Sequence, residues 1–560
     1  MAAPEPLGDL IARRDPDTAR MLRRAAGSSS SVRLDRARSG EISAAVTRPE
    51  GGTLRLHSRY DPRREAERRL AELPAAATLV VYGLGAAWLP RLILEQRPRA
   101  SVLVFEPEAA AVNEVLASPL AEDLRPALST GRLRIVCEPR ALGRAVEETH
   151  QPALATGLAA YLLPGRFSPS AEPLLREAQQ IVSAALGSAM ADTATMQRSA
   201  LSWFTHALET SLNGRAAALR AGSRRLAELI STRAHTAVVV GAGPSLDARP
   251  DAEIHPPGAV TVAVDTAVPA LQARGIVPEL VVSLDSQGWS ALHLRHRLPP
   301  SVLVVADLGA SWAVTREAES VLTIVGGHPL HRLLLGSGFP AALLHAPTGN
   351  VTMAALMVAR RLAPVVSVLG ADGGYPGAAT YARGTYHHRW AAGRASRRNP
   401  VEQQFAARVY PLTGVPRDDG TGRPLFTSAA MESTGRRLRA AAGEQPPDAP
   451  ALDLPDESHG ADDFDACAFW TGHRQELVAL RHRIPTAPCS TPELLARLGP
   501  HGMAHLPLAA AAAAGRLPAA SGGLEPLHAA LEWVLRYLDR RLDPERRAVK
   551  KGFPFGVKDR

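Results

Sequence analysis

Six short runs of apolar, mostly β-branched residues in the middle of the chain each end on glycine or aspartate, and this pattern limits how the chain can fold. The runs are HTAVVVG, VTVAVD, ELVVSLD, VLVVAD, VLTIVGG and VVSVLGAD, which begin at residues 235, 260, 279, 302, 321 and 365. Runs without polar alternation are typical of parallel strands that helices cover on both faces. The pattern therefore predicts a doubly wound α/β sheet with a ligand crevice outside the carboxyl ends of its strands.

A shorter series of the same kind precedes this one. TLVVY at 78–82 leads into Gly83-Leu84-Gly85, SVLVF at 101–105 leads to Glu106, and LRIV at 133–136 supplies a third strand. Glu106 stands where nucleotide-binding folds often hold a ribose hydroxyl. Because a lone Gly-x-Gly is a weak signal, the favoured interpretation is a structural domain that keeps the turn without a ligand. Binding of S-adenosylmethionine is the remote alternative.

The length of 560 residues exceeds what one hydrophobic core usually holds. We predict an α/β protein with two Rossmann-like parallel-sheet domains in tandem, followed by a helical C-terminal region that includes the amphipathic segment HAALEWVLRYLDRRL. The predicted parts are an N-terminal arm or cap (1–55), a Rossmann-like domain (56–170), a nucleotide-binding domain (171–415) with a helical lead-in (171–232), and a loop with helices (416–560).

Lysine usage excludes one large class of nucleotide enzymes. The lysines are Lys550, Lys551 and Lys558, whereas a P-loop needs a lysine directly after its glycine-rich turn. The net charge is +9, but the basic residues are spread along the chain without an RNA-module signature, so we expect no nucleic-acid partner. A basic surface suits an anionic sugar nucleotide or an acidic protein equally well.

Further features predict a cytoplasmic protein without a structural metal. No apolar stretch is long enough for a membrane span, and the first residues lack the apolar core of a signal peptide. Cys137, Cys467 and Cys489 are far apart and form no CxxC pair. We expect no structural zinc, no disulfide and no tightly bound cofactor.

The turn after the first central strand is a candidate nucleotide-binding element. Gly241 and Gly243 allow the backbone to pass close to a ligand, while Pro244 and Ser245 stiffen the turn and supply a hydroxyl and free amides. At the start of a helix such amides can face a phosphate. A glycine-rich turn is by itself equally compatible with a structural role.

Aspartates follow four of the predicted strands, namely Asp265, Asp285, Asp307 and Asp372. Because the carboxyl ends of parallel strands meet at one edge of a sheet, we expect these side chains to converge on one site. Asp265 and Asp285 each stand alone on a strand, so contacts to ribose or base are favoured over metal binding.

Two further segments belong to the same predicted edge. Thr348, Gly349 and Asn350 open a helix that leads into the strand before Asp372, and a helix N-terminus can hold an anion. The loop after this strand is rich in phenol, imidazole and guanidinium groups, which can stabilise a leaving phosphate and accept a proton near neutral pH. A surface loop packed on the fold is the structural alternative. The loop residues are Tyr375, Tyr381, Tyr386, His387, His388 and Arg389.

Several motifs together carry a family resemblance. VVVGAGPSLD, IVPELVVSLD, TGNVTMAALMVAR and VLGADGGYP occur in this order and resemble the central domain of the motility-associated factor glycosyltransferases. That domain is similar to bacterial CMP-sugar sialyltransferases and to MptE-like 6-hydroxymethylpterin diphosphokinases. LHSRYDPRREAERRL at 56–70, followed by VVYGLG, resembles the N-terminal domain of the same family. The resemblance covers most of residues 56–390.

The resemblance implies an enzyme that transfers a nonulosonic, sialic-acid-like sugar from a CMP-sugar to serine or threonine of flagellin, as needed for flagellar assembly and motility. The implied reaction inverts the sugar carbon and is independent of metal or only weakly dependent on it, with Mg²⁺ as the candidate ion. The implied partners are the CMP-activated sugar and flagellin. A homo-oligomer is left open.

The resemblance also assigns roles to residues of this sequence. Ala242 stands where the sialyltransferases have asparagine. The base would be a histidine after the third matching element, and His387 and His388 are the candidates, with His459 as a more distant one. Tyr375 and Tyr386 would act beside the base. The nucleotide-binding residues would be Gly241, Gly243, Pro244, Ser245, Asp265, Asp285, Thr348, Gly349, Asn350 and Asp372.

Two other functions remain open. An MptE-like diphosphokinase would transfer pyrophosphate from ATP and would require Mg²⁺. A non-catalytic accessory protein would keep the sheet and its turns but only bind flagellin. One α/β architecture supports many chemistries, so the fold alone does not decide among these functions.

Overall fold

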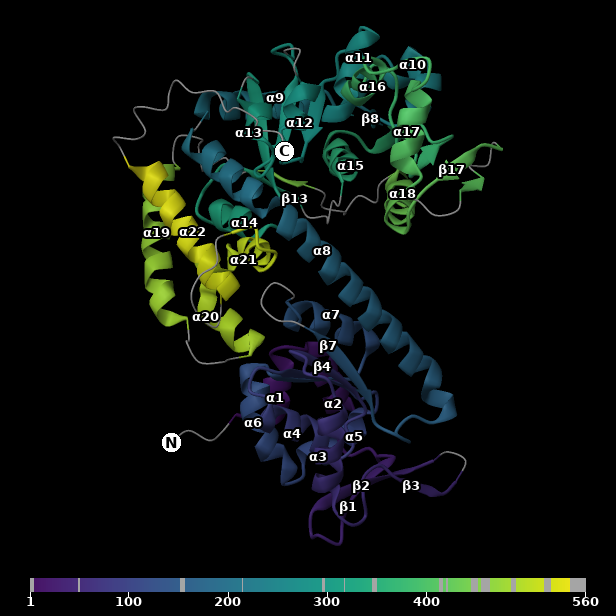
Figure 1. Ribbon diagram of the computed structural model, residues 1–560, viewed down its shortest axis with the longest axis vertical. Helices are drawn as coiled ribbons and strands as arrows, with labels where there is room; N and C mark the ends of the chain where they lie inside the picture. Colours follow the sequence, from purple (N-terminus) through teal and green to yellow (C-terminus); the bar gives the residue numbers. More distant parts are fainter. Residues whose placement is uncertain are drawn as a thin grey trace. The chain divides into compact units, whose positions relative to one another are not determined.

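The computed structural model describes residues 5–543 apart from short gaps at 49–50, 152–156, 214, 295–297, 317, 345–349, 412–415, 419–421, 445–451, 455–463, 485–489 and 518–524. The chain forms two compact units (Figure 1). The first comprises Met1–Ala200 and His473–Arg560, and the second comprises Leu201–Gly472. Within the described part of the chain, no helix combines the length and hydropathy that crossing a membrane requires.

A parallel sheet with the strand order β6-β5-β4-β7 is the centre of the first unit. The side chains of β4, β5 and β6 are buried throughout, which explains why their sequences are apolar without alternation. These three strands confirm the sequence prediction. β7 was not predicted because its side chains are only partly buried and its sequence, LAAYL, has few β-branched residues. The strands are β4 (Thr78–Tyr82), β5 (Ser101–Phe105), β6 (Leu133–Val136) and β7 (Leu158–Leu162).

The residues before this sheet form a cap on it. Leu10, Leu22, Val32 and Val46 lie in the same hydrophobic core as β4 and β5. The cap contains two helices and an antiparallel sheet with the order β1-β2-β3. Its elements are α1 (Leu7–Ala12), α2 (Pro16–Arg24), β1 (Val32–Arg36), β2 (Ile42–Thr47) and β3 (Thr53–Arg55).

Helices surround the first parallel sheet and lead to the second unit. Asp61 caps the first of them by accepting a hydrogen bond from the Arg64 amide at 2.8 Å. The predicted helical lead-in is confirmed by α8 and α9. The helices are α3 (Pro62–Glu72), α4 (Trp88–Gln96), α5 (Ala109–Leu116), α6 (Leu120–Thr130), α7 (Pro139–Thr149), η1 (Pro169–Ala171), α8 (Glu172–Leu212) and α9 (Ala216–Ser231).

The second unit contains a larger sheet with the order β18-β14-β8-β9-β10-β11-β12-β13-β19, in which β8 to β14 run parallel. All six predicted strands are present. From β8 the chain proceeds strand by strand to β13 and then returns through α15, so that β14 lies on the other side of β8. The topological switch point therefore lies between β8 and β14. The parallel strands are β8 (Thr236–Val240), β9 (Val260–Val264), β10 (Leu280–Ser283), β11 (Leu303–Asp307), β12 (Ser320–Val325), β13 (Ala342–Leu344) and β14 (Val365–Leu369).

Short strands from the proline- and acid-rich region were not predicted. β18 pairs with β14 and β19 pairs with β13, both antiparallel, so this region completes the two edges of the larger sheet. A separate small antiparallel sheet has the order β15-β17-β16. These strands are too short to leave a periodic signal in the sequence. They are β15 (Tyr375–Pro376), β16 (Arg417–Asp418), β17 (Pro424–Phe426), β18 (Gly443–Glu444) and β19 (Leu452–Asp453).

Helices connect the strands of the second unit, and α15 packs against β8, β9 and β14. Its buried apolar residues, among them Leu356 and Val358, contribute to the main core of the unit. The connecting helices are η2 (Pro244–Ala248), α10 (Asp251–Ile254), η3 (Asp265–Ala267), α11 (Val268–Ala273), α12 (Trp289–His293), α13 (Trp312–Thr315), α14 (Pro329–Gly336), α15 (Val351–Leu362), α16 (Tyr386–Ala392), α17 (Val401–Val409) and α18 (Ala429–Ala441).

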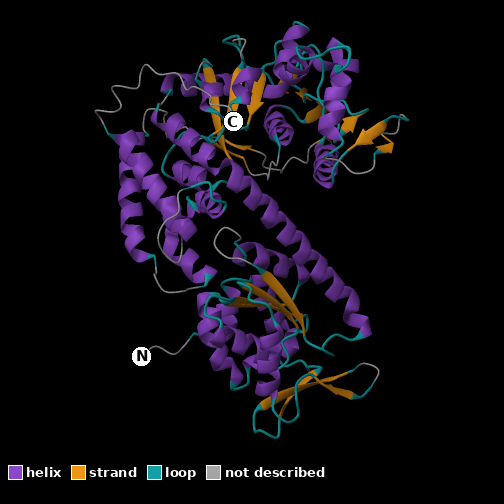
Figure 2. Ribbon diagram, viewed as in Figure 1, coloured by secondary structure: helices purple, strands orange, loops and turns teal. Residues whose placement is uncertain are grey.

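The C-terminal region is helical, as predicted (Figure 2). A capping box of Ser490 and Glu493 begins α20, and α21 packs on α22 through buried alanine and leucine side chains. The helices are α19 (Ala466–Arg483), α20 (Thr491–Met503), α21 (Leu506–Ala513) and α22 (Glu525–Leu542).

Candidate functional site

The glycine turn, Gly241–Gly243, leaves β8 directly beside the end of β14. The Gly241 amide donates to the Leu369 carbonyl, and the Gly243 amide donates to the Gly370 carbonyl, each at 2.8 Å. A Cβ atom on Gly241 would collide with the Gly370 carbonyl oxygen, and one on Gly243 would collide with the Asp372 carboxylate. The close approach of two turns of this chain therefore requires both glycines, whether or not a ligand is bound.

Asp372 holds the two turns together from the β14 side. Its Oδ2 accepts a hydrogen bond from the Ser245 amide at 3.1 Å. The sequence predicted that this amide faces a phosphate at the start of a helix, but the structure uses it for Asp372 and continues the turn as the short 3-10 helix η2. Ser245 is half-buried, and its hydroxyl has no partner among the described residues. The hydroxyl is thus the group of Ser245 that is available to a ligand.

Two backbone amides of the loop after β15 donate hydrogen bonds to the glycine turn and to the adjoining helix η2. The Ala382 amide donates to the Ala242 carbonyl, and the Arg383 amide donates to the Asp247 carboxylate, each at 2.9 Å. Thr385 is fully buried and caps α16, because its hydroxyl accepts from the His388 amide at 3.2 Å. These contacts fix where α16 begins relative to the switch point.

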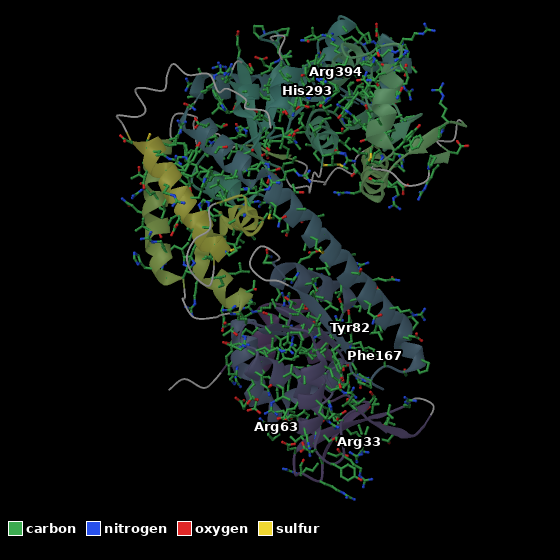
Figure 3. The ribbon with its side chains drawn as sticks, viewed as in Figure 1. Arg33, Arg63, Tyr82, Phe167, His293 and Arg394 are labelled. Carbon is green, nitrogen blue, oxygen red and sulfur yellow. The ribbon has the colours of Figure 1, made fainter. Side chains whose placement is uncertain are left out.

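The start of α16 brings aromatic and imidazole rings together in what we call the imidazole cluster, Tyr381, Tyr386, His387 and His293. Tyr381 stacks on His387 with ring centroids 4.4 Å apart. His293, from α12 (Figure 3), lies 5.2 Å from the His387 ring and 5.9 Å from the Tyr386 ring. The segments that follow β10 and β14 therefore both contribute side chains to this cluster.

Burial and nearby charges keep the imidazoles of the cluster neutral. Burial, together with the neighbouring His293 and Arg408, lowers the pKa of His387 to about 4. Burial also lowers the pKa of His293, against the opposing effect of Asp285. A neutral imidazole can accept a proton, so both rings are competent bases at neutral pH.

Asp265 and Asp285 follow neighbouring strands, as predicted, but they differ in availability. Asp265 is buried and accepts hydrogen bonds from the Ser283 hydroxyl at 2.6 Å and from the amide and hydroxyl of Thr266 at 2.6 and 2.9 Å. Asp285 is exposed and accepts from the Gln287 amide at 2.9 Å. Asp265 is thus committed to the fold, and Asp285 is the carboxylate that can contact a ligand. No group of His, Cys, Asp or Glu side chains suited to a metal occurs in the described ranges.

The remaining predicted site residues that the structure describes lie at the start of α15, in β15 and in α16. Asn350 caps α15 by accepting from the Met353 amide at 2.9 Å. Tyr375 pairs with Phe426 in the small sheet and raises the pKa of Tyr381, in addition to the effect of burial. His388 points toward Phe405, with ring centroids 6.3 Å apart, and is not part of the imidazole cluster. Thr348, Gly349 and His459 lie outside the described residues.

Asp307, the aspartate at the end of β11, contacts a second cluster of side chains. Its Oδ1 lies 3.5 Å from Nδ1 of His331, which is buried and stacks on His328 at 4.2 Å. Trp203 contacts His328 edge to face. Burial raises the pKa of Asp307 to about 7 and lowers that of His328 to about 4. This pairing leaves no local signal in the sequence because His331 lies on α14, beyond the next strand.

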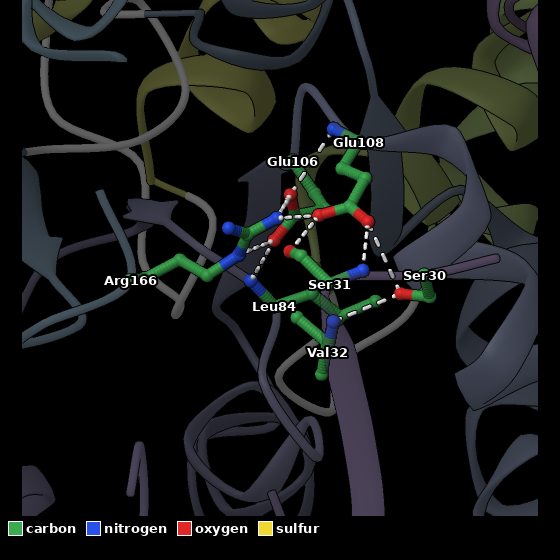
Figure 4. A network of polar contacts seen from close by, with 7 residues as sticks. All are labelled: Ser30, Ser31, Val32, Leu84, Glu106, Glu108 and Arg166. Carbon is green, nitrogen blue, oxygen red and sulfur yellow. Dashed lines mark hydrogen bonds and ion pairs between the residues drawn. The ribbon is translucent and has the colours of Figure 1, made fainter. Parts of the chain in front are cut away.

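The corresponding edge of the N-terminal domain is occupied by the chain's own side chains (Figure 4). Glu106 is fully buried and forms a two-pronged ion pair with Arg166, whose Nε donates to Oε2 at 2.8 Å. Arg166 also reaches Glu108 at 2.9 Å. A Cβ atom on Gly83 would meet the Arg166 side chain, and the Ala86 amide donates to Nε2 of His57 at 2.9 Å. Glu106 is therefore not available to a ribose, which agrees with the structural interpretation of this turn.

His293, Trp289 and Arg408 contribute to the central site but were not predicted. Trp289 lies 6.1 Å from Tyr386, and Arg408 affects the pKa of both His387 and Tyr381. His293 follows Asp285 by eight positions on a five-residue helix, which is too short for a periodic signal. Arg408 is one of many arginines, and only the fold distinguishes it from the others.

Comparison with known families agrees with part of the sequence resemblance. Residues 217–376 match the family described as 6-hydroxymethylpterin diphosphokinase MptE-like. The central domain is similar to this family. The match includes the glycine turn, Asp285, His293 and Asp372 and ends at β15, before Tyr381, Tyr386 and His387. It confirms the MptE-like resemblance that the motifs predicted.

Other comparisons found individual proteins that share low sequence identity with this chain. An uncharacterized protein of Treponema pallidum (strain Nichols) is 28% identical over 159 residues, which span 25% of this chain and 40% of the relative. The solved structure of MAf glycosyltransferase from Magnetospirillum magneticum AMB-1 is 15% identical, with a TM-score of 0.49, and the alignment covers 97% of this chain and 96% of that one.

Proposed function

We propose that this protein is a cytoplasmic glycosyltransferase that moves a nonulosonic sugar from a CMP donor to serine or threonine hydroxyls of flagellin. The observation that carries the proposal is the neutral His387 imidazole, stacked on Tyr381 beside His293, on a loop fastened to the glycine turn. The motifs shared with motility-associated factor glycosyltransferases support the donor and the acceptor.

In the proposed reaction, the acceptor hydroxyl gives its proton to the neutral His387 as its oxygen attacks the anomeric carbon of the sugar. The bond from this carbon to the CMP phosphate oxygen breaks, and the configuration of the sugar carbon inverts. The Tyr381 phenol and the Arg408 guanidinium supply hydrogen-bond donors and positive charge for the departing phosphate. The exposed carboxylate of Asp285 would contact the ribose or base.

A diphosphokinase is the second candidate, because the family model over residues 217–376 carries that description. This reaction would pass pyrophosphate from ATP to a hydroxymethylpterin and would need Mg²⁺. The exposed carboxylate of Asp285 would then be the natural side chain to contact the ion.

The experiment that separates the two candidates gives purified protein both sets of substrates. In one arm a CMP-nonulosonic acid and unmodified flagellin are incubated, and intact-mass measurement records the addition of sugar. In the other arm ATP, Mg²⁺ and 6-hydroxymethylpterin are incubated, and AMP release is recorded. Sugar addition that is lost in His387→Gln and kept in His388→Gln supports the proposal. AMP release without sugar addition would replace it with the diphosphokinase.

A further inference from the structure

A cavity of about 320 Å³ lies at the carboxyl edge of the N-terminal parallel sheet, within the first unit. It is bordered by Arg48 after β2, by Glu108 after β5, by Arg166 and Ser168 after β7, and by Leu174 at the start of α8. Its volume falls at the lower end of the range that small-molecule sites occupy. The cavity lies beside the turn where a Rossmann domain would hold a nucleotide, the place that Arg166 and His57 fill.

Both acidic side chains at this edge, Glu106 and Glu108, form ion pairs with Arg166. The Glu108 carboxylate also accepts from the Ser30 and Ser31 hydroxyls and from the Ser31 amide. These bonds, together with Arg166, hold the pKa of Glu108 below its ordinary value against the opposing effect of burial. Among the described residues, no ion pair joins either carboxylate to Arg48.

Arg48 also lines this cavity, and it forms no ion pair with the residues that the structure describes. Its Nε atom is buried without a hydrogen-bond partner, and among the described residues no carboxylate pairs with its guanidinium. Arg48 is only partly buried and lines the cavity, so its guanidinium can bond to an acceptor that enters it. An anionic acceptor would bind more strongly than a neutral one, since charge-assisted hydrogen bonds to guanidinium are stronger than neutral ones.

The other lining residues restrict which ligand shapes the cavity accepts. Val46 and Leu174 add apolar surface to the lining, and Ser168 adds a polar residue. We propose that this cavity binds a small molecule with one anionic group, a carboxylate or a phosphate monoester. The anion pairs with Arg48, and the body of the molecule lies against Val46 and Leu174. This site is separate from the proposed transferase site and does not depend on that function.

The test uses the full chain and three probes that share one sugar ring: glucose 6-phosphate, glucuronate and neutral glucose. Calorimetry measures affinity, and hydrogen–deuterium exchange locates the protected segments. We expect one or both anions to bind, glucose not to bind, and protection over 42–48 and 164–175. The phosphate and carboxylate arms identify which anion the site prefers.

Variants make the test specific to the cavity. Arg48→Gln should weaken binding at least tenfold, and Leu174→Phe should weaken it by filling the space without changing a charge. Arg33→Gln, at an exposed position on the adjacent strand β1, is the matched control and should bind as the native protein does. Unchanged binding in Arg48→Gln, protection confined to the second unit, or no binding of either anion would overturn the proposal.

Discussion

The Ser245 amide donates a hydrogen bond to the carboxylate of Asp372, which lies 127 positions further along the chain. This bond joins the turn after β8 to the turn after β14 across the topological switch point. The same turn also holds Ala382, which positions the loop that carries His387. The glycine turn therefore positions the loop that carries the proposed catalytic residues. It is also a candidate contact for a phosphate.

Gly243→Ala tests this arrangement. The added methyl group meets the Asp372 carboxylate and the Gly370 carbonyl oxygen, which lies 2.8 Å from the ideal Cβ position. Overpacking of this kind costs about 1–3 kcal/mol and displaces Asp372. We expect a lower melting temperature and at least tenfold weaker nucleotide binding by calorimetry. Gly336→Ala, where a Cβ meets nothing within 4 Å, is the matched control and should change neither quantity.

His387→Gln and His388→Gln separate two adjacent histidines that the sequence could not distinguish. His387 lies in the imidazole cluster, whereas His388 contacts Phe405. Loss of a general base lowers the rate by about 10²–10⁴-fold. We expect a loss in this range of the transfer rate for His387→Gln and less than a threefold change for His388→Gln. Equal losses in both variants would show that neither ring is the base.

The pH dependence of the transfer rate follows from the same residue. A pKa of about 4 leaves His387 neutral from about pH 5 upward, so its protonation should not limit the rate between about pH 5 and 8. The acidic limb of a kcat/KM profile should then fall below pH 5. A limb near pH 6.5, the ordinary value for histidine, would contradict the buried environment of this ring.

Asp307→Asn should stabilise the protein at alkaline pH. Burial raises the pKa of Asp307 in the folded state to about 7, above its ordinary value of 3.8. Between these values the folded state retains a proton that the unfolded state has released, so this carboxyl lowers stability as pH rises through the window. Asn removes the titration. The stability of Asp307→Asn relative to the native protein should increase from pH 4 to pH 8 by about 1 kcal/mol or more in urea unfolding. Glu319→Gln, at an exposed position, should show no such trend.

Glu106→Gln tests whether the N-terminal turn is structural. The substitution leaves Arg166 buried with only Glu108 as a charged partner, and breaking a buried pair costs about 3–5 kcal/mol. We expect a large loss of stability in urea unfolding and no change in nucleotide affinity. The control is Glu95→Gln, which removes an exposed ion pair with Arg63 and should leave the stability nearly unchanged. A loss of nucleotide binding in Glu106→Gln would instead assign a ligand to this turn.

The sequence predicted the strands of both parallel sheets well, since buried runs such as VTVAVD leave a strong local signal. Topology predicted that the glycine turn and Asp285 lie at one edge of the sheet, whereas the family resemblance supplied His387 and His388 as candidate bases without deciding between them. Local sequence could not predict that Asp265 accepts hydrogen bonds from Ser283 and Thr266. It also could not predict that Asp307 contacts His331. Those outcomes depend on hydrogen bonds between segments far apart in the chain. His293 joins the site for the same reason.

The edge strands β18 and β19 show a similar limit. Each has two residues, in a region rich in proline and acidic residues, and neither has a periodicity of its own. They form because β14 and β13 offer unpaired backbone groups at the edges of the sheet. A property of the assembled sheet, absent from the local sequence, therefore decides their conformation.

The most direct test of the proposed function is a calorimetric titration of the purified protein with CMP, with ATP plus Mg²⁺ and with S-adenosylmethionine as parallel ligands. The account predicts that CMP binds with one site per chain and that Gly243→Ala weakens this binding at least tenfold, whereas Gly336→Ala does not. Binding of ATP with Mg²⁺ in place of CMP, or no binding of any of these ligands, would contradict a CMP-sugar transferase.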